Sequence, residues 1–395
     1  MSEKTGKPQG INTRLAHMGW NPRDYFGFVN PPITRGSTIL FPDAATMESR
    51  DQPYTYGTRG TPTHTALENA VNELEGSAGT ILLPSGLAAV TIPLLAYAEA
   101  GSHMLITDAI YNPTRRMADT MLRRMGVEVE YYDPLIGADI ARLMRPNTRV
   151  VFTEAPASNT FEMQDVPAIA EVARAHGAVT MMDNTYATPL FFKPLDHGVD
   201  ISIHAATKYP AGHADILFGM VSANARAWER IHDTHISLGC PAHPEDVFLV
   251  LRGLRTMALR LERHQASTLA VSSWLLEQPG IRAVLNPALP HDPGHSLFTR
   301  DFSGSTSVFS VVLDGTGDAK RDKAKAHAFL DGLRIFGLGY SWGGYESLAV
   351  HVWLGDRTIS RRDYGGPVIR LQIGIEDVAD LQDDLAQALA AANAA

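Results

Sequence analysis

Short apolar runs alternate with amphipathic stretches through the middle of the chain. Apolar runs of about four to eight residues are typical of buried strands, and the predicted strands are Gly79–Leu83, His103–Thr107, Val127–Tyr132, Arg149–Thr153, Ala178–Met182, Asp200–His204 and Ile216–Ser222. Apolar residues recur at helical spacing between them, and the predicted helices are Gly86–Ala98, Pro113–Met125 and Val166–His176. Such repeated units predict an α/β fold with a mostly parallel sheet and helices on both faces.

The two ends of the chain differ from this middle region. Residues 1–60 are rich in Pro, Gly, Thr and Asn, which predicts an extended arm that lies across another surface. A helical stretch over Val247–Leu276 is predicted to lead into a smaller α+β unit. Its predicted elements are the strands Ser307–Leu313 and Val368–Ile373 and the helices Ala324–Leu333 and Val378–Leu389. The expected parts are an N-terminal arm over 1–60, a large domain over 61–255 and a small domain over 256–395.

Composition and charge exclude several classes of protein. Apolar residues make up 45% and charged residues 19%, which is typical of a globular protein, and 395 residues suggest about two domains. The net charge of −9 argues against a nucleic-acid partner. Cys240 is the single cysteine, so an intrachain disulfide is excluded. Because Met1 to Gly10 is polar and no long apolar run occurs, we expect no signal peptide, no membrane partner and a cytoplasmic location.

Two polar residues follow apolar strands in the same part of the chain. Lys208 ends the run Ala205-Ala206-Thr207-Lys208, and Asp183 ends the run Met181-Met182-Asp183. A surface lysine is the alternative interpretation, but surface lysines rarely follow an apolar run. An amine and a carboxylate at neighbouring strand ends suit pyridoxal phosphate, because the amine forms a Schiff base with the aldehyde and the carboxylate keeps the pyridine nitrogen protonated. We therefore predict a pyridoxal phosphate site here.

Other residues near the strand ends suit the same cofactor. Gly86 and Leu87 open a helix directly after a strand, where backbone amides and the helix dipole bind phosphate, although such a turn is usually only a helix cap. Thr207 adds a hydroxyl beside Lys208. Tyr111 follows another predicted strand, and its ring would either stack on the pyridine or belong to the core.

Four longer motifs extend this pattern over nearly the whole chain. They are Met182-Asp183-Asn184-Thr185, Ala205-Ala206-Thr207-Lys208-Tyr209, Leu251-Arg252-Gly253-Leu254-Arg255-Thr256 and Ser341-Trp342-Gly343-Gly344-Tyr345-Glu346-Ser347-Leu348. From about Tyr56 to Asp377 the chain resembles the Cys/Met-metabolism family of pyridoxal phosphate enzymes. The resemblance implies a fold-type-I, aspartate-aminotransferase-like architecture. It also implies a homotetramer built from two tight dimers, with each active site completed by the dimer partner.

The resemblance further implies roles for single residues. The residues expected at the cofactor are Lys208, Asp183, Tyr111, Gly86, Leu87 and Thr207, with Tyr56 and Arg59 reaching the phosphate of the neighbouring subunit. The residues expected at the substrate are Arg370, Ser341 and Trp342. The residues expected to act in catalysis are Lys208, Tyr111 and Ser341. Arg370 is expected to bind the substrate α-carboxylate through both arms of its guanidinium, which arginine does better than lysine.

The reaction implied by the resemblance is an α,β-elimination that cleaves L-cystathionine to homocysteine, pyruvate and ammonia, as in methionine biosynthesis. Lys208 would remove the α-proton, and either Lys208 or Tyr111 would protonate the leaving sulfur. The alternatives are a methionine γ-lyase, a cystathionine γ-synthase or a broader cysteine-S-conjugate β-lyase. Trp342 favours β-elimination, because γ-acting relatives usually carry a small or aliphatic residue there. No Gly-x-Gly-x-x-Gly motif supports a dehydrogenase, and the Asp, Lys and Arg set disfavours a non-enzymatic scaffold.

Two stretches depart from the family pattern. Relatives usually carry Tyr-x-Arg at the cross-subunit phosphate site, whereas this chain has Tyr56-Gly57-Thr58-Arg59, so Arg59 would have to act in place of an arginine at Thr58. Ser158 occupies a position where many relatives have asparagine, and Asn159 follows it.

Two further patterns concern the substrate and metals. Arg115 and Arg116 follow Tyr111, where a distal ammonium group on the substrate would favour an acid, so the sulfur substrate stays open. The histidines offer i,i+4 pairs such as His291 and His295, but these lack a third ligand on a helix, and we predict no metal site.

Overall fold

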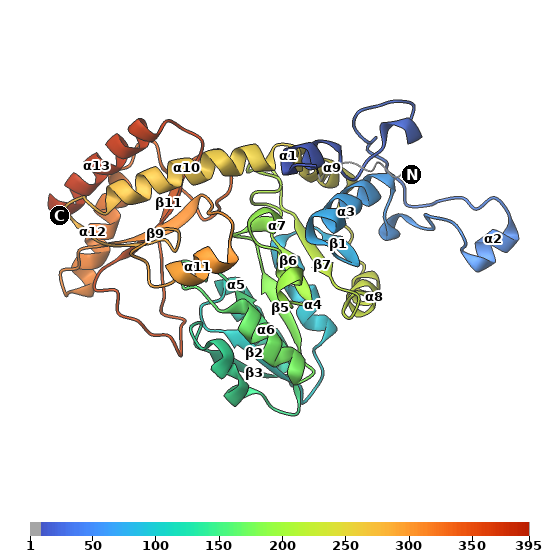
Figure 1. The fold of residues 1–395 in the computed structure, drawn as a ribbon, viewed down its shortest axis with the longest axis horizontal. Helices are drawn as coiled ribbons and strands as arrows, with labels where there is room; N and C mark the ends of the chain where they lie inside the picture. Colours follow the sequence, from blue (N-terminus) through green and yellow to red (C-terminus); the bar gives the residue numbers. More distant parts are fainter. Residues whose placement is uncertain (1–8, 395) are drawn as a thin grey trace.

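Two sheets joined by a long helix form the body of the protein (Figure 1). The computed structural model describes residues 9–394. Residues 1–8, on which the prediction about a leader mainly rests, lie outside the described residues. No described helix is long and apolar enough to cross a membrane.

The large sheet has seven strands in the order β1-β7-β6-β5-β4-β2-β3. The strands are β1 (Gly79–Leu83), β2 (His103–Thr107), β3 (Glu128–Tyr132), β4 (Thr148–Glu154), β5 (Val179–Asp183), β6 (Ile201–His204) and β7 (Gly219–Ala223). Strands β2 to β6 pair in parallel, while β7 runs antiparallel to β1 and β6. No helix crosses over between β6 and β7, so these two strands can only be antiparallel neighbours. The mostly parallel α/β sheet predicted from the sequence is confirmed.

Helices cover both faces of this sheet, because the strands are apolar on both sides. The helices are α3 (Pro62–Glu75), α4 (Gly86–Ala96), α5 (Asn112–Met117), α6 (Val166–Ala175), α7 (Thr188–Phe191) and α8 (Trp228–Leu238), with shorter turns η3 (Ala118–Leu122), η4 (Gly137–Leu143) and η5 (Pro194–His197). Met104 and Ile106 of β2 face the core formed with α4, whereas Leu105 between them faces the core formed with α6. The helix predicted over Pro113–Met125 is α5 continued by a π-helical turn, η3.

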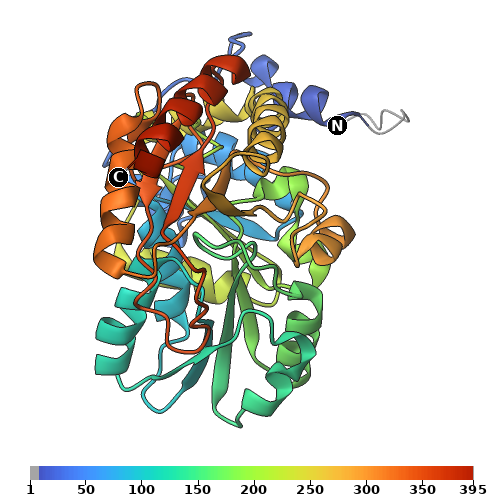
Figure 2. The ribbon, with the colours of Figure 1, turned by 90° about the vertical axis from the view of Figure 1, so that its left-hand side faces the viewer.

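The small sheet is mainly antiparallel and has the order β10-β11-β12-β9-β8. Its strands are β8 (Ile281–Leu285), β9 (Val308–Leu313), β10 (Gly337–Leu338), β11 (Leu348–His351) and β12 (Val368–Gln372), and its helices are α11 (His295–Asp301), α12 (Ala319–Gly332) and α13 (Val378–Ala394). Helices α12 and α13 lie side by side over it (Figure 2). The connecting stretch is two helices, α9 (Pro244–Leu254) and α10 (Met257–Leu275), because Thr256 leaves helical geometry at φ −113° and ψ 6°. The boundary proposed after residue 255 stays a prediction.

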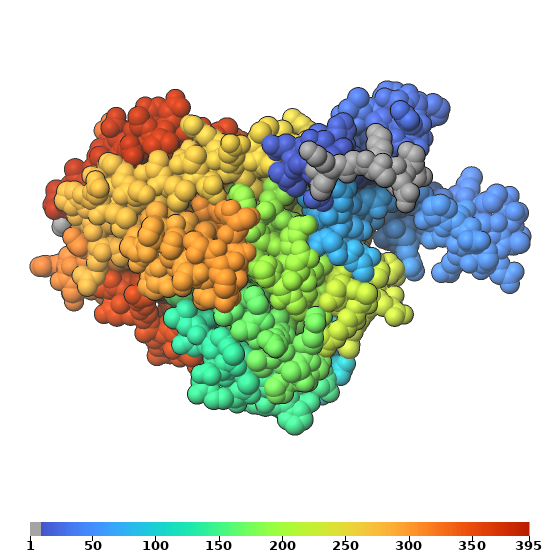
Figure 3. Space-filling model, in the orientation of Figure 1, coloured from blue at the N-terminus to red at the C-terminus, as the bar shows by residue number. Residues whose placement is uncertain are grey.

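The N-terminal arm is not wholly extended. It contains α1 (Ile11–His17), η1 (Pro22–Asp24), α2 (Ala44–Ser49) and η2 (Gly57–Arg59). Helix α1 packs on the body through Leu15, but the segment that carries α2 projects away from the body as a separate lobe (Figure 3). Within one chain the arm leaves large apolar side chains exposed, including Phe26 at 97% and Leu40 at 85%.

Candidate active site

Lys208 lies just after β6, where a turn of the small unit meets the large sheet. Its Nζ donates a hydrogen bond of 2.8 Å to Oγ of Ser341 and lies 5.1 Å from the centre of the Trp342 ring. Gly343 allows this approach, because its φ of +83° is unfavourable for other residues and a Cβ there would lie 3.2 Å from Cα of Lys208. The structure therefore brings Lys208, Ser341 and Trp342 together as expected from the sequence.

The amine of Lys208 has a reduced proton affinity. Burial, and then the positive charge of Arg370, lower its pKa to about 8, whereas Asp183 acts in the opposite direction. An amine with this pKa is partly neutral near pH 7, and only the neutral form can attack an aldehyde or remove a proton.

Asp183 ends β5, next to the strand that leads to Lys208. Its Oδ1 accepts hydrogen bonds from the backbone N–H of Thr185 at 3.0 Å and from the Thr185 hydroxyl at 2.5 Å. The N–H of Ala205 donates to the same hydroxyl at 2.9 Å, which ties the two strand ends together. Burial raises the pKa of Asp183, and Thr185 opposes this effect. Since Oδ2 receives no hydrogen bond from the described residues, Asp183 fits a protonated ring nitrogen.

A second carboxyl group lies beside Asp183 and was missed by the sequence analysis. Glu154 ends β4 in direct register with Asp183, and its Oε2 accepts the backbone N–H of Tyr111 at 2.8 Å. Burial, and then the charge of Asp183, raise the pKa of Glu154 well above its usual value. The signal in the sequence is that Glu154 follows a predicted strand just as Asp183 does. Glu154 thus holds the loop that carries Tyr111, whose side chain is 45% exposed within one chain.

Arg370 reaches the site from the small sheet. On β12, Ile369 and Leu371 point into the core under α13, so strand alternation places Arg370 on the opposite face. Its Nη1 donates to Oδ1 of Asn159 at 3.2 Å, and its Nη2 donates to the carbonyl oxygen of Tyr340. Burial lowers the pKa of Arg370 to about 10. The guanidinium is therefore held in place and suits a carboxylate ligand.

The predicted phosphate-binding residues lie at the start of α4 and after β6. Ser85 caps α4 by accepting the N–H of Ala88 at 3.1 Å, and the first-turn amides of Gly86 and Leu87 have no intrahelical acceptor. A Cβ on Gly86 would lie 2.5 Å from Cβ of Ala205, so only glycine fits there. These amides fit a phosphate group. The Thr207 hydroxyl is engaged with Phe218, donating to its carbonyl at 3.2 Å and accepting its N–H at 2.8 Å, and would have to turn to donate to phosphate.

Tyr56, Arg59 and Arg115 lie outside this cluster within one chain. No hydrogen bond or ion pair among the described residues links Tyr56 or Arg59 to Lys208 or Asp183. Arg115 does not face a substrate, because it is buried and bound to Asp108 at 2.6 Å. The part of the chain that the structure describes contains no cluster of three His, Cys, Asp or Glu side chains able to hold a metal ion.

The fold and this cluster define a pyridoxal phosphate enzyme. Residues 12–390 match the family model described as "Cys/Met metabolism PLP-dependent enzyme", and the chain belongs to this family. The family confirms the predicted cofactor.

Relatives and solved structures agree with this assignment over nearly the whole chain. A protein of Rhizobium johnstonii named "Putative cystathionine beta-lyase" is 62% identical over 98% of this chain and 97% of its own length. The cystathionine beta-lyase MetC of Escherichia coli is 41% identical over 95% of this chain and 97% of its own length. The crystal structure of a cystathionine gamma synthase from Xanthomonas oryzae, in complex with aminoacrylate and cysteine, has a TM-score of 0.90 at 31% identity and covers 98% of this chain and 100% of that one.

Proposed function

We propose that this protein is a carbon–sulfur β-lyase that cleaves L-cystathionine to homocysteine, pyruvate and ammonia. The observation that carries the proposal is the position of Lys208 Nζ, which is hydrogen-bonded to Ser341 and lies beside the Trp342 ring. A bulky indole at this point limits how the substrate side chain bends over the reacting carbons. Elimination at the β-carbon needs only the α-proton removed, whereas γ-elimination needs a second proton removed from the β-carbon.

The residues of the chain suit the steps of this reaction. When bound, pyridoxal phosphate supplies an electron sink for the pair left by removal of the α-proton. Asp183 would hold the proton of the cofactor's ring nitrogen, and Tyr111 would stack on the ring. Lys208 removes the α-proton with its neutral Nζ, which Ser341 orients. Either Lys208 or Tyr111 would give a proton to the leaving sulfur, which departs as the thiol. Hydrolysis by water then yields pyruvate and ammonia.

Arg370 gives the substrate its orientation. Its guanidinium would bind the α-carboxylate and so place the α-proton near Lys208 Nζ. The two groups approach from different sheets, which is why the position of the small unit matters for the reaction.

The N-terminal arm supports a homo-oligomer. Its exposed Phe26, Phe28 and Leu40 form more apolar surface than a lone chain would leave in water. We infer that the arm packs on a second copy and brings Tyr56 and Arg59 to the phosphate of that copy, in a dimer or in a tetramer of two dimers. The single cysteine suits a reducing compartment, and we expect the assembly to act in the cytoplasm.

Product analysis tests the proposed reaction. The holoenzyme is given L-cystathionine, and keto acids and thiols are separated by chromatography. Pyruvate with homocysteine in equal amounts is the expected result. Mainly 2-oxobutanoate with cysteine would overturn β-elimination, and loss of the L configuration without thiol release would overturn the lyase assignment.

Variants of Trp342 refine the same test. Trp342→Ala should lower kcat/KM for cystathionine with the cofactor still bound, whereas Trp342→Phe, the matched control, should retain most of it. Equal activity of all three proteins would show that the indole does not shape the pocket.

A further inference from the structure

A loop of the small unit lies across two loops of the large sheet. We call residues 354–364, between β11 and β12, the strap. It descends from the small sheet towards the segment that carries α5 (Figure 2). We propose that Arg357 of the strap is a positioning residue for substrate binding, because it holds the turn at residues 158–160 so that Asn159 fixes the guanidinium of Arg370.

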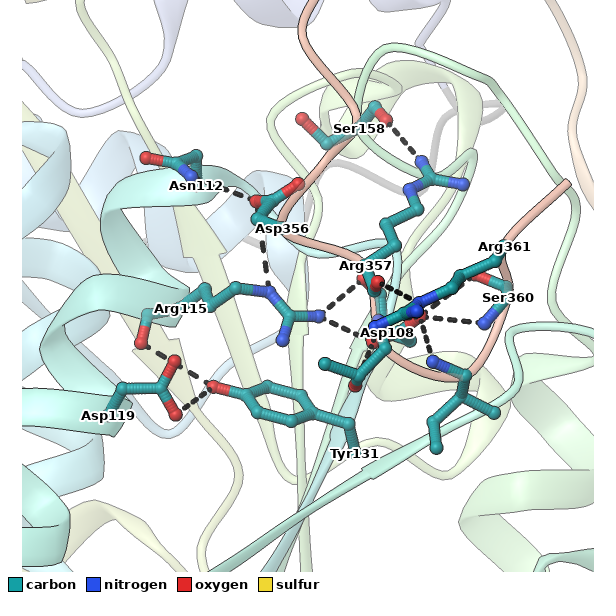
Figure 4. Close-up of polar contacts among 12 residues, drawn as sticks. Asp108, Asn112, Arg115, Asp119, Tyr131, Ser158, Asp356, Arg357, Ser360 and Arg361 are labelled. Carbon is teal, nitrogen blue, oxygen red and sulfur yellow. Dashed lines mark hydrogen bonds and ion pairs between the residues drawn. The ribbon is translucent and has the colours of Figure 1, made fainter. Parts of the chain in front are cut away.

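Asp108 anchors the middle of the strap to the large sheet (Figure 4). Its carboxylate accepts the backbone N–H groups of Thr358 at 3.0 Å, Ile359 at 2.9 Å and Ser360 at 2.8 Å. Burial acts to raise the pKa of Asp108, but these N–H groups and Arg115 outweigh it and hold the pKa far below its usual value. A carboxylate bound in this way fixes the strap backbone beside the Tyr111 loop.

Arg357 makes the contacts on the other side of the strap. Its side chain is buried, with 5% of its surface exposed. Nη1 donates to Oε1 of Glu162 at 3.0 Å, while Nη2 donates to the carbonyl of Ser158 at 3.1 Å and to the Thr160 hydroxyl. The hydroxyl of Tyr364, at the end of the strap, donates to the same Glu162 oxygen at 2.9 Å. Burial acts to raise the pKa of Glu162, but Arg357 and these hydrogen bonds lower it overall, so a charged pair is fixed between the two units.

The turn that Arg357 holds has an unfavourable backbone geometry. Asn159 has φ +66°, which asparagine adopts more readily than most residues, whereas Phe161 has φ +59°, which a bulky residue rarely adopts. Such a turn persists only where its surroundings hold it. Arg357 holds the carbonyl before Asn159, and Ser310 donates to the carbonyl of Asn159 itself at 2.6 Å.

The turn in its present form aims Asn159 at Arg370. Oδ1 of Asn159 accepts Nη1 of Arg370 at 3.2 Å, and Ser310, which holds the same turn, is the cross-strand neighbour of Arg370 on β9. Without the Arg357 fork this turn keeps its backbone hydrogen bonds but loses the charged donor to Ser158 and Thr160, so Asn159 holds the guanidinium of Arg370 less firmly. The inference rests on the proposed role of Arg370 as the carboxylate site.

A comparison of two small amines isolates the carboxylate contact. Glycine and methylamine are titrated separately into the holoenzyme, and binding is followed by the absorbance of the bound cofactor. Both ligands carry the amine, but only glycine carries the carboxylate. In Arg357→Ala the ratio of methylamine Kd to glycine Kd should fall at least tenfold, while methylamine binding and cofactor affinity stay unchanged. For cystathionine, KM should rise tenfold or more, with kcat at saturation changed less than about threefold.

Control variants make the result decisive. Arg362→Ala, at an exposed residue of the same strap whose guanidinium lies 5.3 Å from the centre of the Tyr364 ring and makes no hydrogen bond with the turn at residues 158–160, should keep the wild-type ratio. Arg370→Ala calibrates the assay: an unchanged ratio there would overturn the proposed carboxylate site itself. A lowered ratio in Arg370→Ala with a wild-type ratio in Arg357→Ala would overturn only the role of Arg357. If Arg357→Ala does not fold, Thr160→Val removes one hydroxyl partner of Arg357 and should lower the ratio in the same direction; a wild-type ratio in that variant would contradict the proposal.

Discussion

The cofactor side and the substrate side of the site are held in different ways. Asp183 ends β5, and Lys208 lies in the turn that follows β6, so two neighbouring strands and the bond from Ala205 N–H to Thr185 bring these groups together. Arg370 lies in the middle of β12, but the acceptors that orient it come from two loops, at Asn159 and Tyr340. A site built on strand ends tolerates changes in distant loops, whereas a site oriented by loops depends on contacts far away in the chain. The following predictions test this difference.

Loss of the Lys208 amine should have the largest effect. Lys208→Ala removes the amine that we propose binds the cofactor covalently and moves the α-proton, and kcat should fall about 10⁴-fold. In the unmodified protein, borohydride reduction should fix the pyridoxyl group on Lys208, as read by peptide mass spectrometry. Lys193→Ala is the matched control and should keep its activity. A label on Lys193 would move the cofactor site elsewhere.

Loss of the Arg370 guanidinium should mainly weaken substrate binding and leave the cofactor bound. Losing a bidentate carboxylate contact costs about 2–4 kcal/mol, so Arg370→Ala should lower kcat/KM by two decades or more. Because the residues expected to bind the cofactor lie on the large sheet, the absorbance spectrum of the bound cofactor should be the same in Arg370→Ala as in the unmodified protein. Arg370→Lys keeps the positive charge but cannot bind both carboxylate oxygens as arginine does. Its kcat/KM should therefore lie between those of the unmodified protein and Arg370→Ala. An unchanged kcat/KM would place the carboxylate site elsewhere.

The cofactor side could be predicted from the sequence because its signals are local. The strands β1 and β2 have the predicted bounds, and Asp183 and Lys208 follow apolar runs that any buried parallel strand requires. The same argument could have predicted Glu154, because Glu154 ends β4. Strands β8 and β11 were missed because they are short and each contains only one buried residue, Val284 in β8 and Ala349 in β11.

The substrate side could be predicted only through the family resemblance. Arg370 read alone is an ordinary strand residue, and nothing near it in the sequence indicates Asn159, which lies 211 residues away. The strap contacts are of the same kind, since Arg357 and Glu162 are 195 residues apart. Polar pairs between distant loops have no periodicity and follow no strand, so they leave no pattern to read.

The lowered pKa of Lys208 gives a pH dependence that the substrate side should modify. The rate at which the cofactor-free protein takes up pyridoxal phosphate should rise with pH and level off above a midpoint near 8, because the neutral amine attacks. Arg370→Ala should move this midpoint upward, since the Arg370 charge helps to lower the pKa. Stopped-flow absorbance gives the rates. A midpoint near 10.5 in the unmodified protein would contradict the burial of the amine.

The lowered pKa of Lys208 also makes the free energy of unfolding depend on pH. Between about pH 8 and 10.5 the unfolded chain binds a proton at Lys208 that the folded protein has lost. The free energy of unfolding of the cofactor-free protein should therefore rise with pH in this window. Lys208→Met should lose this rise, as measured by urea denaturation at several pH values.

The arm should give the smallest single effect, because it would add to a phosphate site that we propose the α4 amides form. Arg59→Ala should weaken cofactor binding by about tenfold, the worth of one charge-assisted contact.

If Tyr56 and Arg59 act across a subunit boundary, Lys208→Ala chains mixed with Arg59→Ala chains should form hybrid dimers in which one site has both intact halves. With random pairing half of the dimers are hybrids and half of their sites are intact, so at limiting cofactor about a quarter of the wild-type activity should return. Activity equal to the sum of the two separate variants would place Arg59 and Lys208 of one site in the same chain. Thr58→Arg restores the arginine at the position usual in the family, and tighter cofactor binding in that variant would show that Arg59 only partly replaces it.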